Sequence, residues 1–431
     1  MSDLRMAVVH LDKRTAEVVT PDGDLRRESI GAALNLALIE RYGKESLVFG
    51  GGPLTGTLAP ASALLVGSFA KGAAAKPAQA AQSAQSTLIR HVPLLLTAGP
   101  DFRFSGIDHL VLLGAADRPT LLHIDGGRVR FVELPKQAGD VPSLEPSLRR
   151  SAPPFRSAIL TSPAAEAGVP FAAASIGAKG SLDKAGLAGA MAAKNIKGIL
   201  LGGSGGIAFA AEDLRRSLEL VEKIKRQQKK AGGFTSLVEA AGGGDCLKAL
   251  KGATLRDAAC FHCPAPCMVH AEFAETNPRL PGGPKKKGGV LLLDHMGWIA
   301  LAKKRGGQSL PLLREALRLG LDPSAAASFL PREGTPASDI DALSAMAKDG
   351  GSPVSSSAVP TSPDPFFGGG LAPIGTGEAA RKRNALAFVL GVCPLFLKRF
   401  PQAVGDLLAF LPADVSPASL NRAAERVFAQ G

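Results

Sequence analysis

Three of the five cysteines in this 431-residue chain lie within one eight-residue segment. They are Cys260, Cys263 and Cys267, in the order Cys-x2-Cys-x3-Cys. Pro264 and Pro266 exclude a regular helix here, because proline lacks the backbone N–H that a helix interior needs. The run therefore predicts a turning loop in which neighbouring thiolates point toward the same place. Such a grouping of thiolates favours a metal centre.

The spacing leaves three chemistries open. An iron-sulfur cube takes four thiolates, commonly three from a local run and one from a distant segment, and the distant candidates are Cys246 and Cys393. A structural zinc site usually takes two Cys-x2-Cys pairs or adds histidine, and this chain has one such pair. Unliganded thiols are the third interpretation, although buried unpaired cysteines seldom gather in this way. His262 and His270 flank the run, and we expect them to lie beside the site without ligating a metal.

Composition and charge restrict the class of protein. With 45% apolar and 20% charged residues the chain is globular, and its formal charge of +12 predicts a basic surface. Aromatic residues make up 5% of the chain, too few for a surface on which the bases of a nucleic acid stack. The basic run from Lys223 to Lys230 is interpreted as the charged C-terminal end of a helix. Nucleic acid is therefore not an expected partner.

Cellular location follows from two further patterns. No apolar stretch approaches the roughly 20 residues of a membrane span. The N-terminus lacks the apolar core and small-residue cleavage site of a signal peptide. We expect a cytoplasmic protein without a membrane span, in which reduced cysteines are free to bind metal. Oligomerisation stays open.

The elements that must position the cysteines fall into a sheet-rich first part and a helical second part, which predicts an α+β fold. Short apolar or alternating runs between Gly, Pro and Ser predict strands over Met6–Val9, Leu47–Phe49, Leu110–Leu113, Thr120–Ile124, Val129–Val132, Ala158–Leu160 and Ile196–Leu201. Apolar residues at helical spacing predict helices over Ile30–Tyr42, Leu182–Lys194, Ala211–Lys230, Trp298–Arg305 and Leu310–Gly320. Four parts are expected: a sheet domain over 1–208, a helical domain with the cysteine run over 209–330, a Pro/Ser/Gly-rich linker over 331–380 and a C-terminal helical segment with the distal cysteine over 381–431.

One string in the first part is more specific than its surroundings. Residues 52–60 read Gly-Pro-Leu-Thr-Gly-Thr-Leu-Ala-Pro, which resembles the signature of the N-terminal domain of tungsten-dependent aldehyde ferredoxin oxidoreductases. Further segments resemble that family's landmarks in the same order: Gly106–Gly114, Ala172–Ile199, the cysteine run, Gly320-Leu321-Asp322 and Gly391-Val392-Cys393. The chain thus resembles a shortened and divergent member of that family.

The resemblance implies a cofactor, a ligand set and a partner. It implies a 4Fe-4S cluster held by Cys260, Cys263, Cys267 and Cys393, with Cys246 left as a core thiol. It also implies an N-terminal domain like the family's pterin-binding base, and ferredoxin or a partner oxidoreductase subunit as electron partner. The family's second cofactor is a tungstopterin or molybdopterin, but residues 61–66 carry none of the Arg and Asn anchors that follow its signature.

Three functions are compatible with these patterns. The first is a 4Fe-4S electron-transfer protein of this family that lacks a complete tungstopterin site and works with a partner oxidoreductase. The second is an active tungsten- or molybdenum-pterin enzyme that oxidises aldehydes to carboxylic acids, with ferredoxin as acceptor. The third is a non-enzymatic scaffold subunit whose metal site is structural. No catalytic residue is assigned from the sequence.

Overall fold

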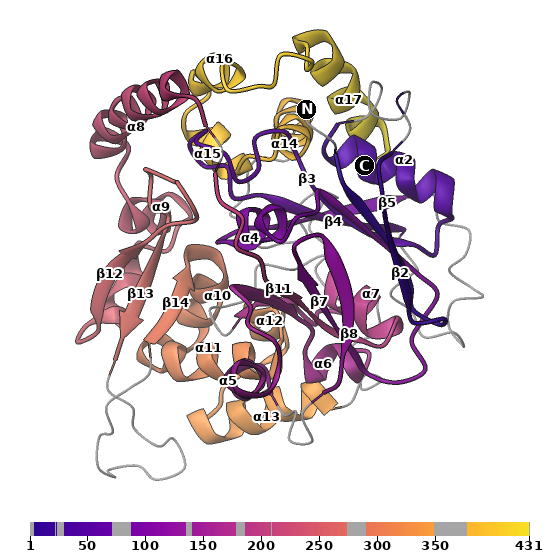
Figure 1. Ribbon diagram of the computed structural model, residues 1–431. Helices are drawn as coiled ribbons and strands as arrows, with labels where there is room; N and C mark the ends of the chain where they lie inside the picture. Colours follow the sequence, from indigo (N-terminus) through magenta and orange to yellow (C-terminus); the bar gives the residue numbers. More distant parts are fainter. Residues whose placement is uncertain are drawn as a thin grey trace.

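The first part of the chain forms two mixed sheets (Figure 1). The computed structural model describes residues 4–21, 23, 30–70, 88–134, 140–177, 186–207, 209–273, 290–348 and 377–430. The six-stranded sheet has the order β2-β1-β6-β3-β4-β5, with β1 and β6 parallel and the other pairs antiparallel. Its strands are β1 (Met6–His10), β2 (Thr15–Val19), β3 (Leu47–Gly51), β4 (Leu65–Ala70), β5 (Ile89–Leu94) and β6 (His109–Leu113).

Two helices accompany this sheet, α2 (Ala32–Tyr42) and α4 (Ala98–Phe104). Helix α2 packs on β3 and β4, and every residue from Ala32 to Ile39 is buried. Strand β4 is buried along its whole length, so it lies in the middle of the core. The loops that follow β3 and β5 therefore begin at strands held in the core by β4, and both loops contribute to the site described below.

The second sheet has five strands in the order β10-β9-β11-β7-β8. They are β7 (Thr120–Asp125), β8 (Arg128–Val132), β9 (Ser157–Leu160), β10 (Ser175–Ile176) and β11 (Ile196–Leu201), with α5 (Val141–Ser151), α6 (Pro163–Glu166) and α7 (Leu187–Ala193). Gly126 and Gly127 have φ values of 56° and 76°, the left-handed conformation that a tight hairpin turn between β7 and β8 requires. All seven strands expected from the sequence are present.

The rest of the described chain is mainly helical, as the sequence predicts. Its elements are α8 (Ala211–Ala231), α9 (Phe234–Ala240), η2 (Gly244–Leu250), α10 (His295–Arg305), η3 (Gly306–Gln308), α11 (Ser309–Leu319), α12 (Pro323–Phe329), α13 (Pro336–Lys348), α14 (Glu378–Leu390), α15 (Pro394–Arg399), α16 (Ala403–Leu408) and α17 (Pro417–Gln430). Helices α14 and α17 pack together and return to α2 in the first part. No described helix is long and apolar enough to cross a membrane.

A small antiparallel sheet in the helical region was not expected. Its strands are β12 (Thr254–Ala258), β13 (Met268–Glu272) and β14 (Val290–Asp294), with β13 in the middle. The first four residues of β12 are exposed and mixed in character, so they give no alternating apolar signal. The cysteine run lies in the connection between β12 and β13.

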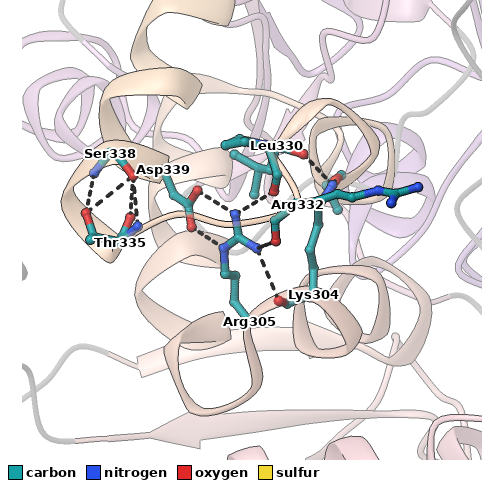
Figure 2. Close-up of polar contacts among 9 residues, drawn as sticks. Lys304, Arg305, Leu330, Arg332, Thr335, Ser338 and Asp339 are labelled. Carbon is teal, nitrogen blue, oxygen red and sulfur yellow. Dashed lines mark hydrogen bonds and ion pairs between the residues drawn. The ribbon is translucent and has the colours of Figure 1, made fainter.

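Part of the segment expected as a linker, 331–380, is helical, because α13 occupies Pro336–Lys348. Arg305 at the end of α10 donates hydrogen bonds to the buried carboxylate of Asp339 on α13, and to the carbonyl oxygens of Pro331 and Arg332 (Figure 2). Lys304 donates to the carbonyl oxygens of Ala327 on α12 and of Leu330, which directly precedes this segment. These contacts fix 331–348 against α10, while 349–376 lie outside the described residues.

Candidate metal centre

The cysteine run forms a turn that is attached to the first sheet. The N–H of Cys263 donates to the carbonyl of Cys260 (3.1 Å), which closes the turn. The N–H of Phe261 donates to the carbonyl of Leu96 (2.8 Å), and the N–H of Leu96 lies 3.4 Å from Cys260 Sγ, toward which it donates. Leu96 follows β5, so one backbone hydrogen bond and one contact to a cysteine sulfur attach the run to the segment after this strand.

Cys393 reaches the same place from the far end of the sequence. It lies between α14 and α15, is 6% exposed, and its N–H donates to the carbonyl of Ala61 (3.0 Å). The N–H of Ala61 in turn donates to the carbonyl of His262 (3.0 Å), in the middle of the cysteine run. Ala61 therefore links the two cysteine-bearing segments through its own backbone.

The signature string forms the loop that makes this meeting possible. A Cβ atom on Gly52 would lie 2.3 Å from the carbonyl carbon of Leu390, and one on Gly391 would lie 2.1 Å from Thr55 Oγ1. The N–H of Leu54 donates to the carbonyl of Leu390 (3.0 Å), so the two backbones touch. Side chains at Gly52 and Gly391 would separate the loop from α14 and displace Cys393.

Unusual backbone conformations gather around the cysteines. Among the described residues, five non-glycine residues have positive φ, and three of them are Ala61 (63°), Leu96 (59°) and His262 (50°). Each makes one of the backbone contacts above. Such conformations cost about 1 kcal/mol or more each and persist where the surroundings over-determine them, commonly at functional sites.

The electrostatics of the thiols indicate that the four cysteines lie near one another. Burial raises the pKa of Cys260 well above its ordinary value, and the neighbouring Cys267, Cys393 and Cys263 raise it further. Burial, followed by Cys393, raises the pKa of Cys263 to about 12, and burial raises that of Cys393. With their pKa values raised, these thiols stay protonated near neutral pH, because burial outweighs the opposing effects of Arg399 and of hydrogen bonds to the backbone.

The other candidates from the sequence are Cys246, His262 and His270. Cys246 is buried on η2, which packs against α9, α10 and η3. Ser217 on α8 donates its hydroxyl hydrogen to the carbonyl of Leu58 (2.8 Å). Because that hydrogen is used, His262 Nε2 is the donor in its contact with Ser217 Oγ (2.9 Å), and this bond holds α8 against the cysteine run. His270 lies on β13 opposite Arg256.

No group of three or more His, Cys, Asp or Glu side chains in the described part of the chain could hold a single metal ion.

A comparison with protein families identifies the N-terminal domain. Residues 6–203 match the profile described as "Aldehyde ferredoxin oxidoreductase, N-terminal domain". The N-terminal domain of this chain belongs to the aldehyde ferredoxin oxidoreductase family. The family assignment made from the signature string is thereby confirmed, as is the expected order of a sheet-rich domain followed by a mainly helical region.

A solved structure supports the same fold beyond that domain. The chain is similar to a chain of the "Active site complex BamBC of Benzoyl Coenzyme A reductase in complex with 1,5 Dienoyl-CoA", with a TM-score of 0.61 and 16% sequence identity. The match covers 80% of this chain and 60% of that one. At this identity the similarity shows a shared fold. No curated protein matches the sequence.

The signature loop of an aldehyde ferredoxin oxidoreductase domain would be expected to meet a pterin, and here it does not offer the contacts. Ala61, Ser62, Ala63, Leu64 and Leu65 are all fully buried. The one hydroxyl among them, that of Ser62, donates to the carbonyl of Thr57 (3.0 Å). This stretch holds no charged or amide side chain, so we assign no pterin to it.

An iron-sulfur cluster fits the site better. Arg399, the last residue of α15, lies near Cys263, Cys267 and Cys393, and its Nη1 atom is buried without a hydrogen-bond partner among the described residues. A buried donor of a cation needs an acceptor, and an anionic cluster at the neighbouring thiols would provide one. Sequence reasoning missed Arg399, and its only signal is its place six residues after the distal cysteine.

Proposed function

We propose that this chain is an electron-transfer protein of the aldehyde ferredoxin oxidoreductase family that holds a 4Fe-4S cluster on Cys260, Cys263, Cys267 and Cys393 and lacks a complete tungstopterin site. The observation that carries the proposal is the convergence of these four thiols from two segments far apart in sequence. Three ligands from a local run and one from a distant segment are a common arrangement for such clusters.

The donor set favours a cluster over a zinc ion. A structural zinc site usually takes two Cys-x2-Cys pairs or adds histidine, and this chain has one such pair. The positive irons of a cluster would lower the raised pKa values of the thiols when it binds.

When bound, such a cluster stores and releases one electron at a time. The chain's own residues would hold it in a buried site, where Leu96 N–H donates to Cys260 Sγ and Arg399 supplies positive charge. Hydrogen bonds to sulfur and limited exposure are the properties that set cluster potentials. We place this protein in the cytoplasm, where a reducing environment keeps its thiols available for metal.

A partner would approach over the end of α8. Four exposed cations, Lys225, Arg226, Lys229 and Lys230, lie within its last two turns. In the same segment, the Gln228 Nε2 donates to the carbonyl of Pro266, next to Cys267 (3.5 Å). An acidic ferredoxin, or an acidic face of a partner oxidoreductase subunit, would be steered to this end and would lie close to the cysteines.

The test is the rate of electron transfer from a reduced acidic ferredoxin to the anaerobically purified, oxidised protein, followed by the visible absorption of the cluster. We expect Lys225→Glu/Lys229→Glu to lower the second-order rate constant about tenfold at low salt, with the difference shrinking at high salt as charges are screened. The control is Lys13→Glu/Lys44→Glu, which makes the same charge change on exposed turns near β1 and α2. Equal slowing in both double variants would contradict docking at α8.

A further inference from the structure

Arg399 is held in place from two directions. It ends the short helix α15, which Cys393 begins. Its Nη2 atom donates to Gln228 Oε1 (2.7 Å) and to the carbonyl of Gly232 (2.6 Å), both at the C-terminal end of α8. Its guanidinium carbon lies 5.4 Å from the centre of the Phe400 ring. The side chain is therefore oriented before any ligand arrives.

The second terminal nitrogen of Arg399, Nη1, differs from Nη2. Arg399 Nη1 is buried and has no hydrogen-bond partner in the described part of the chain. A buried donor without a partner costs about 1–3 kcal/mol, and more when it belongs to a cation. Contact with an aromatic face does not satisfy an N–H, so Phe400 does not offset that cost. A missing acceptor is the simplest account of this nitrogen.

The surroundings of Arg399 indicate where that acceptor belongs. Burial lowers the pKa of Arg399, while Cys267, Cys263 and Cys393 act in the opposite direction. Arg399 in turn opposes the rise in the pKa values of Cys263 and Cys393. The cation thus lies beside three of the four thiols, on the side of the site that faces α8.

We propose that Arg399 donates a hydrogen bond from Nη1–H to a sulfur of the bound cluster and raises the cluster's reduction potential. This rests on the proposed function, because it requires a cluster at the four cysteines. Reduction adds one electron from the partner to the cluster, with no bond made or broken. A fixed cation stabilises the added negative charge, and a hydrogen bond to sulfur acts in the same direction.

The experiment is a redox titration followed by electron paramagnetic resonance, on the full chain purified without oxygen. Arg399→Gln should lower the equilibrium constant for reduction about tenfold, or about 59 mV for one electron, with iron content unchanged. Arg399→Lys should lie between that variant and the wild type, because lysine keeps the charge without the planar fork. The control is Lys398→Gln, which removes the same charge from the adjacent exposed residue and should leave the potential at the wild-type value.

Each other outcome overturns a stated claim. Equal potentials in Arg399→Gln and the wild type, with full iron in both, overturn the role of Arg399 and leave the proposed function standing. A wild-type protein that binds no iron overturns both. Should Arg399→Gln lose its iron, wild-type protein labelled with nitrogen-15 arginine decides: a nitrogen-15 coupling to the reduced cluster is expected, and its absence overturns the proposal.

Discussion

Cys393 and Cys246 are both buried. Serine variants of these two cysteines test which of them is the fourth cluster ligand. We predict that Cys393→Ser loses the cluster, because a serine hydroxyl does not ionise to replace a thiolate ligand. Cys246→Ser should keep full iron, since η2 packs against α9 and α10. Iron and acid-labile sulfide per chain, with circular dichroism as a check on folding, measure both. Full iron in both variants would show that the ligand assignment is wrong.

A second residue-scale feature is a buried polar network under the first sheet. His109 Nδ1 donates to Asn35 Oδ1 (2.9 Å), Asn35 Nδ2 donates to Ser68 Oγ (3.0 Å), and Ser68 Oγ lies 2.9 Å from His91 Nδ1. Burial lowers the pKa of His109 from 6.5 to about 3 and that of His91 to about 4. Both rings are therefore neutral in the folded protein near neutral pH.

This network makes stability depend on pH. Below about pH 6.5 the unfolded chain binds protons on both histidines and the folded chain does not, so the free energy of unfolding falls as the pH falls. Each histidine should contribute a loss of about 1.4 kcal/mol between about pH 7.5 and about pH 5.5. Urea unfolding at both pH values measures it. His109→Gln should remove one histidine's share of the loss, and a variant with the full wild-type pH dependence would contradict the role of His109.

At the scale of elements, α13 is attached to α10 by a buried ion pair. Arg305 is 8% exposed and Asp339 is fully buried. Asp339→Ala should lower the free energy of unfolding by about 3 to 5 kcal/mol, because it leaves the Arg305 charge buried without its partner. Glu212→Ala, which breaks the exposed pair with Arg216, should cost less than about 1 kcal/mol. Similar losses in the two variants, measured by urea unfolding, would show that the buried pair does not fix α13.

The elements also show where sequence patterns carry information and where they do not. Strand β3 begins with an apolar run, Leu47 to Phe49, whose residues are all buried, so it could be predicted. Strand β12 is mostly exposed and mixed, and it forms because β13 offers a pairing edge. Helix α13 depends on Arg305, a contact that no local pattern records.

For the whole molecule, the site depends on segments that only the fold brings together. The cysteine run and its chemistry could be predicted from spacing, but spacing left Cys246 and Cys393 equally available. The family resemblance chose Cys393, and the structure shows its route: α14 returns to the signature loop and delivers Cys393 to Ala61. The contacts of Leu96 and Arg399 arise from tertiary packing, so no sequence pattern predicts them. The domain boundary at residue 208 stays a prediction.

The central claim is that four cysteines hold a 4Fe-4S cluster in a chain without a pterin-bound metal. Its most direct test is the content of iron, acid-labile sulfide, zinc, tungsten and molybdenum per chain in protein purified without oxygen. We predict about four irons and four sulfides, with no tungsten or molybdenum. Iron together with tungsten or molybdenum would contradict the account in favour of aldehyde oxidation, and zinc without iron would contradict any redox role for the four cysteines.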